Sequence, residues 1–160
     1  PMASAGAARN ADVLTYSGVG NVSAAAGAMY VEGFSSVALV GGFAAITDTV
    51  NNRVDIRPGT ASTSLIISSG GVLQANISSG VGALSTLLKC GVSWTTNSAN
   101  IVVNGTAGTL DTSVTPPASL TLIQVGGLDG ATGSEPFASI RNLRIYNRAL
   151  SAAELVAMTA

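Results

Sequence analysis

The chain has 160 residues, about the length of one domain, and 47% of them are hydrophobic while only 9% are charged. This composition excludes an intrinsically disordered chain, because disordered chains are poor in apolar residues and rich in charge. The formal net charge of −1, with seven basic residues, leaves no basic stripe for a nucleic acid, and no apolar run approaches the roughly 18 residues that span a membrane.

Short apolar runs recur along the chain between turn residues, which is the pattern of a β-sandwich or barrel. In three runs the apolar residues alternate with polar ones, as a half-buried strand requires: residues 53–57, 73–78 and 88–94. Three other runs are apolar on both faces: residues 65–67, 101–103 and 120–125. These predict strands that are covered on both sides, in the sandwich centre or beneath another subunit. In all we expect about ten to twelve strands.

Turn residues separate these runs. Asn104-Gly105 directly follows the run 101–103 and predicts a hairpin, because both residues tolerate the positive φ of a type I′ turn. Gly70-Gly71 predicts a second hairpin between 65–67 and 73–77. Residues 126–135 contain four glycines without periodicity and are expected to form a loop.

The apolar face of the run 88–94 carries Cys90 and Trp94, so both are predicted to lie in the core. Cys90 is the one cysteine of the chain, which rules out a disulfide within it. A free cysteine on an apolar face acts as a small hydrophobic residue, and we expect no reactive role for it.

Only the end of the chain has helical signals. Ser151 and Glu154 form a capping box, and Leu150 stands where a hydrophobic staple would pack against Leu155. We predict one short C-terminal helix at about residues 151–158, docked on the sandwich. The preceding cluster of basic residues is interpreted as a solvated strand edge with a contact to this helix: Arg141, Arg144 and Arg148.

The same segment carries a family resemblance. Residues 140–155, I-R-N-L-R-I-Y-N-R-A-L-S-A-A-E-L, resemble the closing motif of the concanavalin A-like lectin/laminin G-like superfamily. Residues 94–105 look like that family's strand, turn and strand ending in N-G. Residues 8–14 and 27–32 are similar to the R-x-A-D-V and G-T-x-Y-x-E strands at the C-terminal ends of phage tail fibres, tailspikes and other virion proteins. Ala28 stands where threonine is usual.

The resemblance implies an all-β fold, a two-sheet antiparallel jelly-roll sandwich. It implies that residues 1–160 form a single domain, the C-terminal part of a longer virion protein assembled in the cytoplasm of a bacterial host. It further implies a homo-oligomer, with a trimer favoured, in contact with other virion proteins and with host-surface polysaccharide. Partnership with a nucleic acid and insertion into a membrane are not expected.

The residues for catalysis are missing from the sequence. There is no histidine, which removes the commonest general base and metal ligand. A glycoside hydrolase needs two carboxyl groups facing each other across a cleft. The three glutamates do not have that pattern, since Glu32 is placed at a strand end, Glu135 in the glycine loop and Glu154 in the capping box. We therefore expect no enzyme and no catalytic residue, with a glycoside hydrolase as a minor alternative.

Calcium (Ca²⁺) is the cofactor that deserves a test, because laminin G-like domains often carry this ion at the sandwich rim. It binds several hard oxygen ligands. Asp48 and Asp129 are placed in loops that could meet in space, and they are the candidate ligands. Turn formation is the favoured interpretation of both residues, so we expect no metal and no cofactor.

Two functions fit the sequence. The first is a non-enzymatic adhesion domain that binds host-surface glycan or a receptor, with candidate contacts at predicted loops and strand ends: Phe34, Asn97, Asp129 and Phe137, and also the aromatic Tyr16. The second is a capsid decoration or oligomerisation domain that acts only through protein contacts. The low charge and the strands with two apolar faces favour it, because large apolar surfaces usually mark interfaces.

Overall fold

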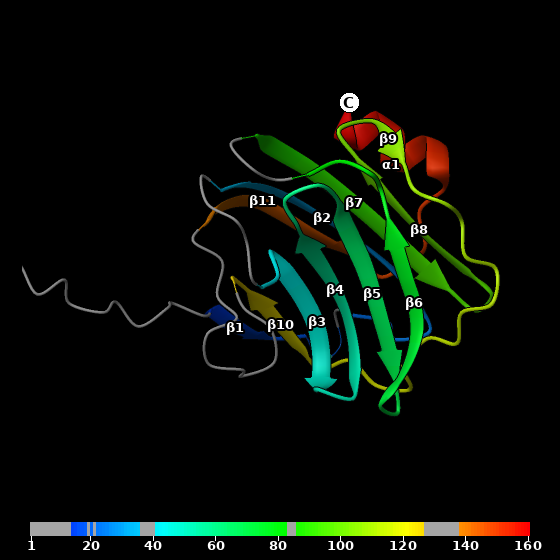
Figure 1. The fold of residues 1–160 in the computed structure, drawn as a ribbon. Helices are drawn as coiled ribbons and strands as arrows, with labels where there is room; N and C mark the ends of the chain where they lie inside the picture. The colour runs from blue at the N-terminus through cyan, green and yellow to red at the C-terminus, as the bar shows by residue number, and fades with distance from the viewer. Residues whose placement is uncertain (1–13, 19, 21, 36–40, 83–85, 127–137) are drawn as a thin grey trace, which may run out of the picture.

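Strands make up most of the chain in the computed structural model, which describes residues 14–18, 20, 22–35, 41–82, 86–126 and 138–160 (Figure 1). In this part there are eleven strands and one helix: β1 Leu14–Ser17, β2 Ala26–Ser35, β3 Ala44–Thr49, β4 Asn52–Pro58, β5 Thr63–Ser69, β6 Val72–Ser78, β7 Leu87–Thr95, β8 Ser98–Val103, β9 Thr106–Ala107, β10 Leu122–Val125, β11 Ala138–Tyr146 and α1 Ala152–Thr159. The number of strands agrees with the prediction.

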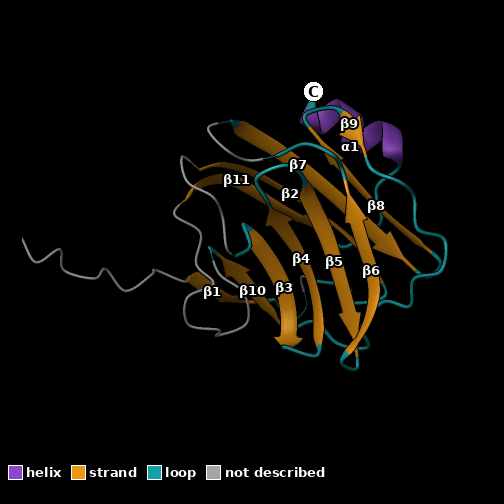
Figure 2. Cartoon of the chain, in the orientation of Figure 1, coloured by secondary structure: helices purple, strands orange, loops and turns teal. Residues whose placement is uncertain are grey.

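The strands form two sheets that face each other as layers (Figures 1 and 2). The six-stranded sheet has the order β1-β10-β3-β4-β5-β6, and the five-stranded sheet has the order β11-β2-β7-β8-β9. All neighbouring strands are antiparallel. Strands from the two ends of the chain pair with each other, β1 with β10 and β11 with β2. The predicted two-sheet antiparallel sandwich is thus confirmed.

The predicted hairpin turns are where the sequence places them. Asn104 and Gly105 join β8 to β9 with φ of 47° and 74°, and Gly70 and Gly71 join β5 to β6 with φ of 58° and 80°. Asn97, between β7 and β8, also has a positive φ of 57°. These values lie in the left-handed region, which glycine and asparagine adopt more readily than other residues.

The core lies between the sheets and contains the predicted inward residues of the runs 53–57 and 88–94. Of the run 73–78 it contains Ala75 and Ile77, whereas Leu73 is 58% exposed because the register of β5 and β6 shifts between Ala75 and Leu73.

Trp94 and Cys90 on β7 are buried, and the indole Nε1 of Trp94 donates to the Ala24 carbonyl at 3.1 Å. Burial also raises the pKa of the Cys90 thiol, as expected for an inert, structural cysteine. Gly27 of β2 faces the Trp94 ring so closely that an added Cβ would lie 2.3 Å from it.

Helix α1 covers part of the outer face of the five-stranded sheet. It begins after Ser151, whose capping box with Glu154 is formed as predicted, although the helix starts and ends one residue later than expected. Leu150 and Leu155 pack there against Ala28 and Val102. The helix is thus what covers the second face of the run 101–103. With eight residues, α1 is too short to cross a membrane, and the described residues contain no helix that could.

The run 120–125 differs from its prediction. Only residues 122–125 form a strand, and Leu122, Ile123 and Val125 are half-buried. The reason is position, since β10 lies beside the edge strand β1, where the sheet is less completely covered. By contrast Ile66 of β5, in the run 65–67, is buried on the outer face as predicted.

Candidate functional site

The predicted ligand contacts do not gather in one place. Phe34 lies near the end of β2, where it pairs with Leu87 at the start of β7, whereas Asn97 follows the other end of β7. Nine residues of strand, roughly 30 Å, separate them. Tyr16 is exposed on β1 of the other sheet. Phe137 and Asp129 lie outside the described residues. Phe34 and Asn97 therefore cannot bind the same small ligand.

The calcium candidate Asp48 lies at the end of β3, beside the β3–β4 turn. Its Oδ1 accepts a hydrogen bond from Thr49 Oγ1 at 3.0 Å, and its Oδ2 accepts one from Asn52 Nδ2 at 3.3 Å. These are the contacts of a turn-forming aspartate. Among the described residues no three acidic, cysteine or histidine side chains come together as metal ligands. The expectation that no calcium is bound stays a prediction, because the other candidate ligand, Asp129, lies outside this part of the chain.

A cluster of polar and aromatic side chains lies on the outer face of the five-stranded sheet, beside α1. We call it the Glu32 platform, and it consists of Tyr30, Glu32 and Phe34 on β2 with Arg141, Asn142 and Arg144 on β11. Strand register places them together, because Arg144 pairs with Tyr30 and Arg141 with Glu32. The three β2 residues alternate with Met29 and the other residues that point into the core, so all three face outward.

Glu32 is the centre of the platform. Its Oε1 accepts from Tyr30 Oη at 2.8 Å and from Asn142 Nδ2 at 2.9 Å, while its Oε2 accepts from Arg141 Nε at 2.7 Å. The bonds from Asn142, Tyr30 and Arg141 lower the pKa of the Glu32 carboxyl, so this side chain is an anion at neutral pH. Burial and the bond to Glu32 raise the pKa of Tyr30 to about 12, which keeps its hydroxyl protonated.

A β-bulge positions the β11 side chains. Between the pairs Arg141–Glu32 and Arg144–Tyr30, two residues of β11 face one residue of β2. Asn142 has a φ of 52° at this point. The extra residue restores Leu143 to the core side and turns Arg144 outward, onto the same face as Arg141. The Arg144 guanidinium then lies over the Tyr30 ring, 5.5 Å from its centroid.

The sequence analysis missed this cluster. Its placement of Glu32 at a strand end is wrong, because β2 continues through Phe34 to Ser35 and Glu32 is paired on both sides. A signal for the bulge does exist in the sequence. Ile140, Leu143 and Ile145 are three and then two residues apart, whereas an uninterrupted strand needs a constant spacing of two.

A second charged group lies along β4 on the outer face of the six-stranded sheet. The Asp55 carboxylate is fully buried, and its Oδ2 lies 2.7 Å from Arg57 Nη2 and 3.2 Å from Arg53 Nε. A ligand cannot reach this carboxylate. Because a buried charge must be paired to be tolerated, we assign these ion pairs to the stability of the sheet.

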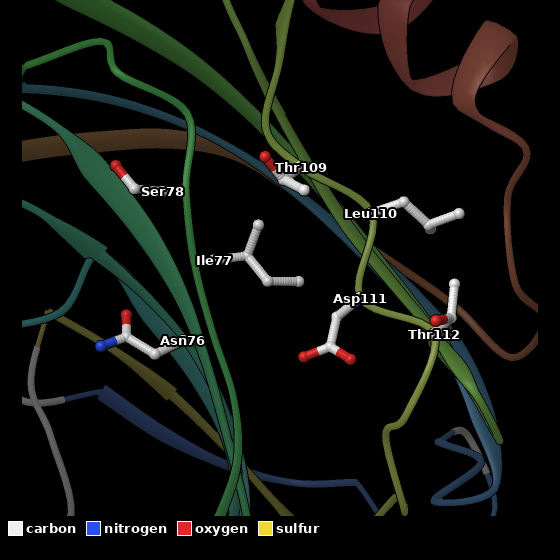
Figure 3. Close-up of a pocket in the computed structure, with 7 residues that line it drawn as sticks. All are labelled: Asn76, Ile77, Ser78, Thr109, Leu110, Asp111 and Thr112. Atoms are coloured by element: carbon white, nitrogen blue, oxygen red, sulfur yellow. The ribbon is translucent and has the colours of Figure 1, made fainter.

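An open pocket of about 440 Å³ lies at the edge of the sandwich, between β6 and residues 109–112 (Figure 3). Its lining consists of one amide, three hydroxyls, two aliphatic side chains and one carboxylate, that of Asp111. The Asp111 Oδ1 is occupied by the backbone N–H and hydroxyl of Ser113, at 2.9 and 2.8 Å. In Figure 3 the exposed Leu110 points away from Ile77, so the pocket offers no broad apolar surface for a sugar ring.

Comparisons with known proteins find no matching family model and no matching curated protein. Solved structures do match. The chain is similar to the CBM40 of the Ruminococcus gnavus IT-sialidase bound to α2,3-sialyllactose, with a TM-score of 0.70 and 13% identity over 86% of this chain and 84% of that one. It is also similar to domain 4 of AbnA, a GH43 extracellular arabinanase from Geobacillus stearothermophilus, in complex with arabinotriose, with a TM-score of 0.69 and 12% identity over 90% and 70% of the two chains.

A third similar structure is the K499G mutant of the NanB sialidase from Streptococcus pneumoniae, with a TM-score of 0.70 and 12% identity. The match covers 87% of this chain but only 25% of the sialidase. At such low identity these likenesses establish the fold alone. The shared fold is a two-sheet antiparallel jelly-roll sandwich, in agreement with the predicted fold class.

Proposed function

We propose that this chain is a non-enzymatic domain that binds glycan through the Glu32 platform. The observation that carries the proposal is the combination of an exposed aromatic ring with fixed polar groups on one face of the five-stranded sheet. Phe34 is 39% exposed and lies two residues from Glu32, whose hydrogen bonds hold Arg141 and Asn142 in place. A sugar can stack its C–H face on such a ring while its hydroxyls bond to planar side chains. Glycan binding by similar domains supports this assignment.

A non-enzymatic role is supported by the state of the glutamates. Glu32 accepts three hydrogen bonds, and Glu154 is held by Arg148 and the helix cap. A general acid in a glycosidase needs a raised pKa, whereas the pKa values of both carboxyls are lowered. Glu135 lies outside the described residues.

We place this function in a phage virion, at a fibre or spike that attaches to the host. The support is the sequence resemblance of residues 8–14 and 27–32 to strands at the C-terminal ends of phage tail fibres, tailspikes and other virion proteins. On this proposal the partners are further copies of the chain, most simply in a trimer, other virion proteins, and polysaccharide of the host surface.

A glycan array that carries host-envelope polysaccharides tests the binding proposal. We expect the wild-type protein to bind a subset of the array and Phe34→Ala to weaken that binding about tenfold, because the apolar platform is removed. Tyr16→Ala is the matched control, since it deletes an exposed aromatic ring on the other sheet and should bind as the wild type does. Equal binding by both variants would place the site elsewhere, and no binding by the wild type would refute the function.

A function through protein contact alone is the second candidate, and one observation favours it. Val50, Val72 and Leu73 are all more than half exposed, and they lie at two adjoining turns. The turns are joined by bonds from Gly71 N–H to the Asn51 carbonyl at 3.0 Å and from Gly70 N–H to Asn52 Oδ1 at 2.8 Å. Clustered aliphatic side chains at the surface of a domain are typical of an interface.

Mass in solution tests this second function. Light scattering should find an oligomer for the wild type and a smaller species for Leu73→Ser, because the variant makes the patch polar. Val156→Ser, which changes an exposed aliphatic residue of α1, is the control and should keep the wild-type mass. A strict monomer at high concentration would leave glycan binding as the function.

A further inference from the structure

We propose that the ligand of the Glu32 platform carries an acidic group, a carboxylate, sulfate or phosphate, and that Arg141 and Arg144 bind it. The inference rests on the proposed glycan-binding function and names the chemical class of the glycan: an acidic polysaccharide. It follows from the backbone of β11, from the charges of the cluster and from the donors that the two guanidinium groups still offer.

The bulge in β11 sets the direction of the two arginine side chains. Positions 141 and 144 are three apart, so in a regular strand their side chains would point to opposite faces of the sheet. Here two residues of β11 face one of β2, and both arginines stand on the outer face. The bulge contains Asn142 with a φ of 52°, in the left-handed region that asparagine adopts more readily than most residues. Such bulges are common where a side chain is aimed for a function.

The charges of the platform do not cancel. The platform contains two guanidinium groups and one carboxylate, that of Glu32, so one positive charge remains uncompensated. Glu32 is largely buried beneath its donors, while 64% of the Arg141 side chain is exposed and Arg144 is exposed as well. The uncompensated charge is therefore presented to solvent, and a ligand that reaches the platform meets it first.

Arg141 and Arg144 have N–H donors left for a ligand. Arg141 uses its Nε for Glu32, and within the described residues neither of its Nη groups makes a hydrogen bond. Arg144 has no hydrogen bond in that part of the chain either and is held by its contact with the Tyr30 ring. Both groups contact a neighbour on the platform, both are exposed on the outer face, and their other N–H donors make no hydrogen bond within the described residues. A planar guanidinium with two free donors binds a carboxylate, sulfate or phosphate in a bidentate manner.

The spacing of residues along β2 places Phe34 near the two arginines. Glu32 and Tyr30, which hold the two arginines, are two residues apart on one strand, about 7 Å. Phe34 lies the same distance beyond Glu32 along β2, about 7 Å. A sugar ring stacked on Phe34 would thus direct an acidic substituent, or the acid of the next sugar unit, toward Arg141 and Arg144. A neutral sugar would leave the positive charge of the platform uncompensated.

Matched pairs of glycans test the inference in titration calorimetry. The probes are a hexuronic acid oligosaccharide and the same oligosaccharide with its carboxyls reduced to alcohols, then sulfated and phosphorylated oligosaccharides with their unesterified parents. We expect at least one acidic probe to bind roughly tenfold to a hundredfold more tightly than its neutral partner, as for a lost charge-assisted bond. The preference should shrink at high salt, because exposed charges are screened. The three pairs distinguish the acid that is bound.

Variants of the arginines complete the test. Arg144→Gln and Arg141→Gln should each lose most of the preference for the acidic probe, so that the affinities for the acidic and the neutral member of a pair become nearly equal. Arg144→Lys, which retains the charge without the bidentate fork, should lie between them and the wild type. Arg148→Gln removes an exposed arginine that pairs with Glu154 outside the platform, and it should leave both affinities unchanged.

The outcomes separate this inference from the function on which it rests. If neutral and acidic probes bind equally well, the acidic ligand is refuted and the glycan-binding function stands. If Arg144→Gln and Arg141→Gln keep the full preference while Phe34→Ala weakens binding, the assignment of the acid to these two arginines is refuted and the glycan-binding function stands. If the wild type binds no probe of either kind, both are refuted. Melting temperatures of the glutamine variants near that of the wild type would assign their effects to binding.

Discussion

The carboxylate of Glu32 gives a prediction at the scale of one residue. Its pKa is lowered in the folded protein by Asn142, Tyr30 and Arg141, while in the unfolded chain it is near the ordinary value of about 4.3. The carboxylate therefore contributes stability above that value, and the contribution is lost as the pH falls through the lower, folded pKa. Stability should decline in acid, below about pH 4.

Glu32→Gln tests this linkage. At neutral pH we expect the free energy of unfolding to fall by about 1–3 kcal/mol, because bonds to a charged acceptor are weakened. Urea unfolding at a series of pH values should give a flatter acid limb for the variant. Part of the acid dependence should remain, since the Glu154 pKa is lowered as well, to about 2. Parallel acid limbs for variant and wild type would contradict the assignment.

Single inward residues were the part of this molecule easiest to predict. Cys90 and Trp94 alternate with polar or small residues on β7, and the period of two fixes their side of the sheet. The partners of Glu32 were beyond reach, because Arg141 is 109 positions away in the chain and only the pairing of β2 with β11 brings them together. Contacts of this length depend on topology, which local alternation does not encode.

At the scale of an element, the path of β2 past Trp94 depends on the lack of a side chain at Gly27. A Cβ there would lie 2.3 Å from the indole ring, so Gly27→Ala must displace either the strand or the ring. We expect a loss of roughly 1–3 kcal/mol or more, as for overpacked cores. Thermal unfolding measures it, and Gly27→Ala combined with Trp94→Phe should recover part of the loss because the smaller ring leaves room. A wild-type melting temperature for Gly27→Ala would refute the close packing.

The elements also divide into those that the sequence predicts and those it does not. The hairpins at Asn104-Gly105 and Gly70-Gly71 follow from residues that accept a positive φ, and helix α1 follows from its capping box. The bulge in β11 was missed because the spacing of Ile140, Leu143 and Ile145 alone does not say which strand lies alongside. The cover over Val102 was missed because a strand with two apolar faces does not identify what lies on either side.

At the scale of the whole molecule, the order of strands joins the two ends of the chain. β1 pairs with β10 in one sheet, and β2 pairs with β11 in the other, so neither sheet is complete until the last strands are in place. Helix α1 packs on β7, β8 and β9 and adds its apolar face to the same sheet. The sandwich should therefore behave as one cooperative unit. The loss of β11 would expose the core residues against which Ile140, Leu143 and Ile145 pack.

Such a topology predicts slow, all-or-none folding. Contacts between distant parts of a chain require loop closure before they stabilise anything, and all-β sandwiches accordingly fold in roughly milliseconds to seconds. The single tryptophan, Trp94, lies in the core and reports on packing, while circular dichroism reports on the strands. We expect the two signals to give the same urea midpoint and the same single-exponential refolding rate. Two separate midpoints, or refolding in microseconds, would mean that one sheet is stable without the pairing of the chain's ends, contrary to the strand order.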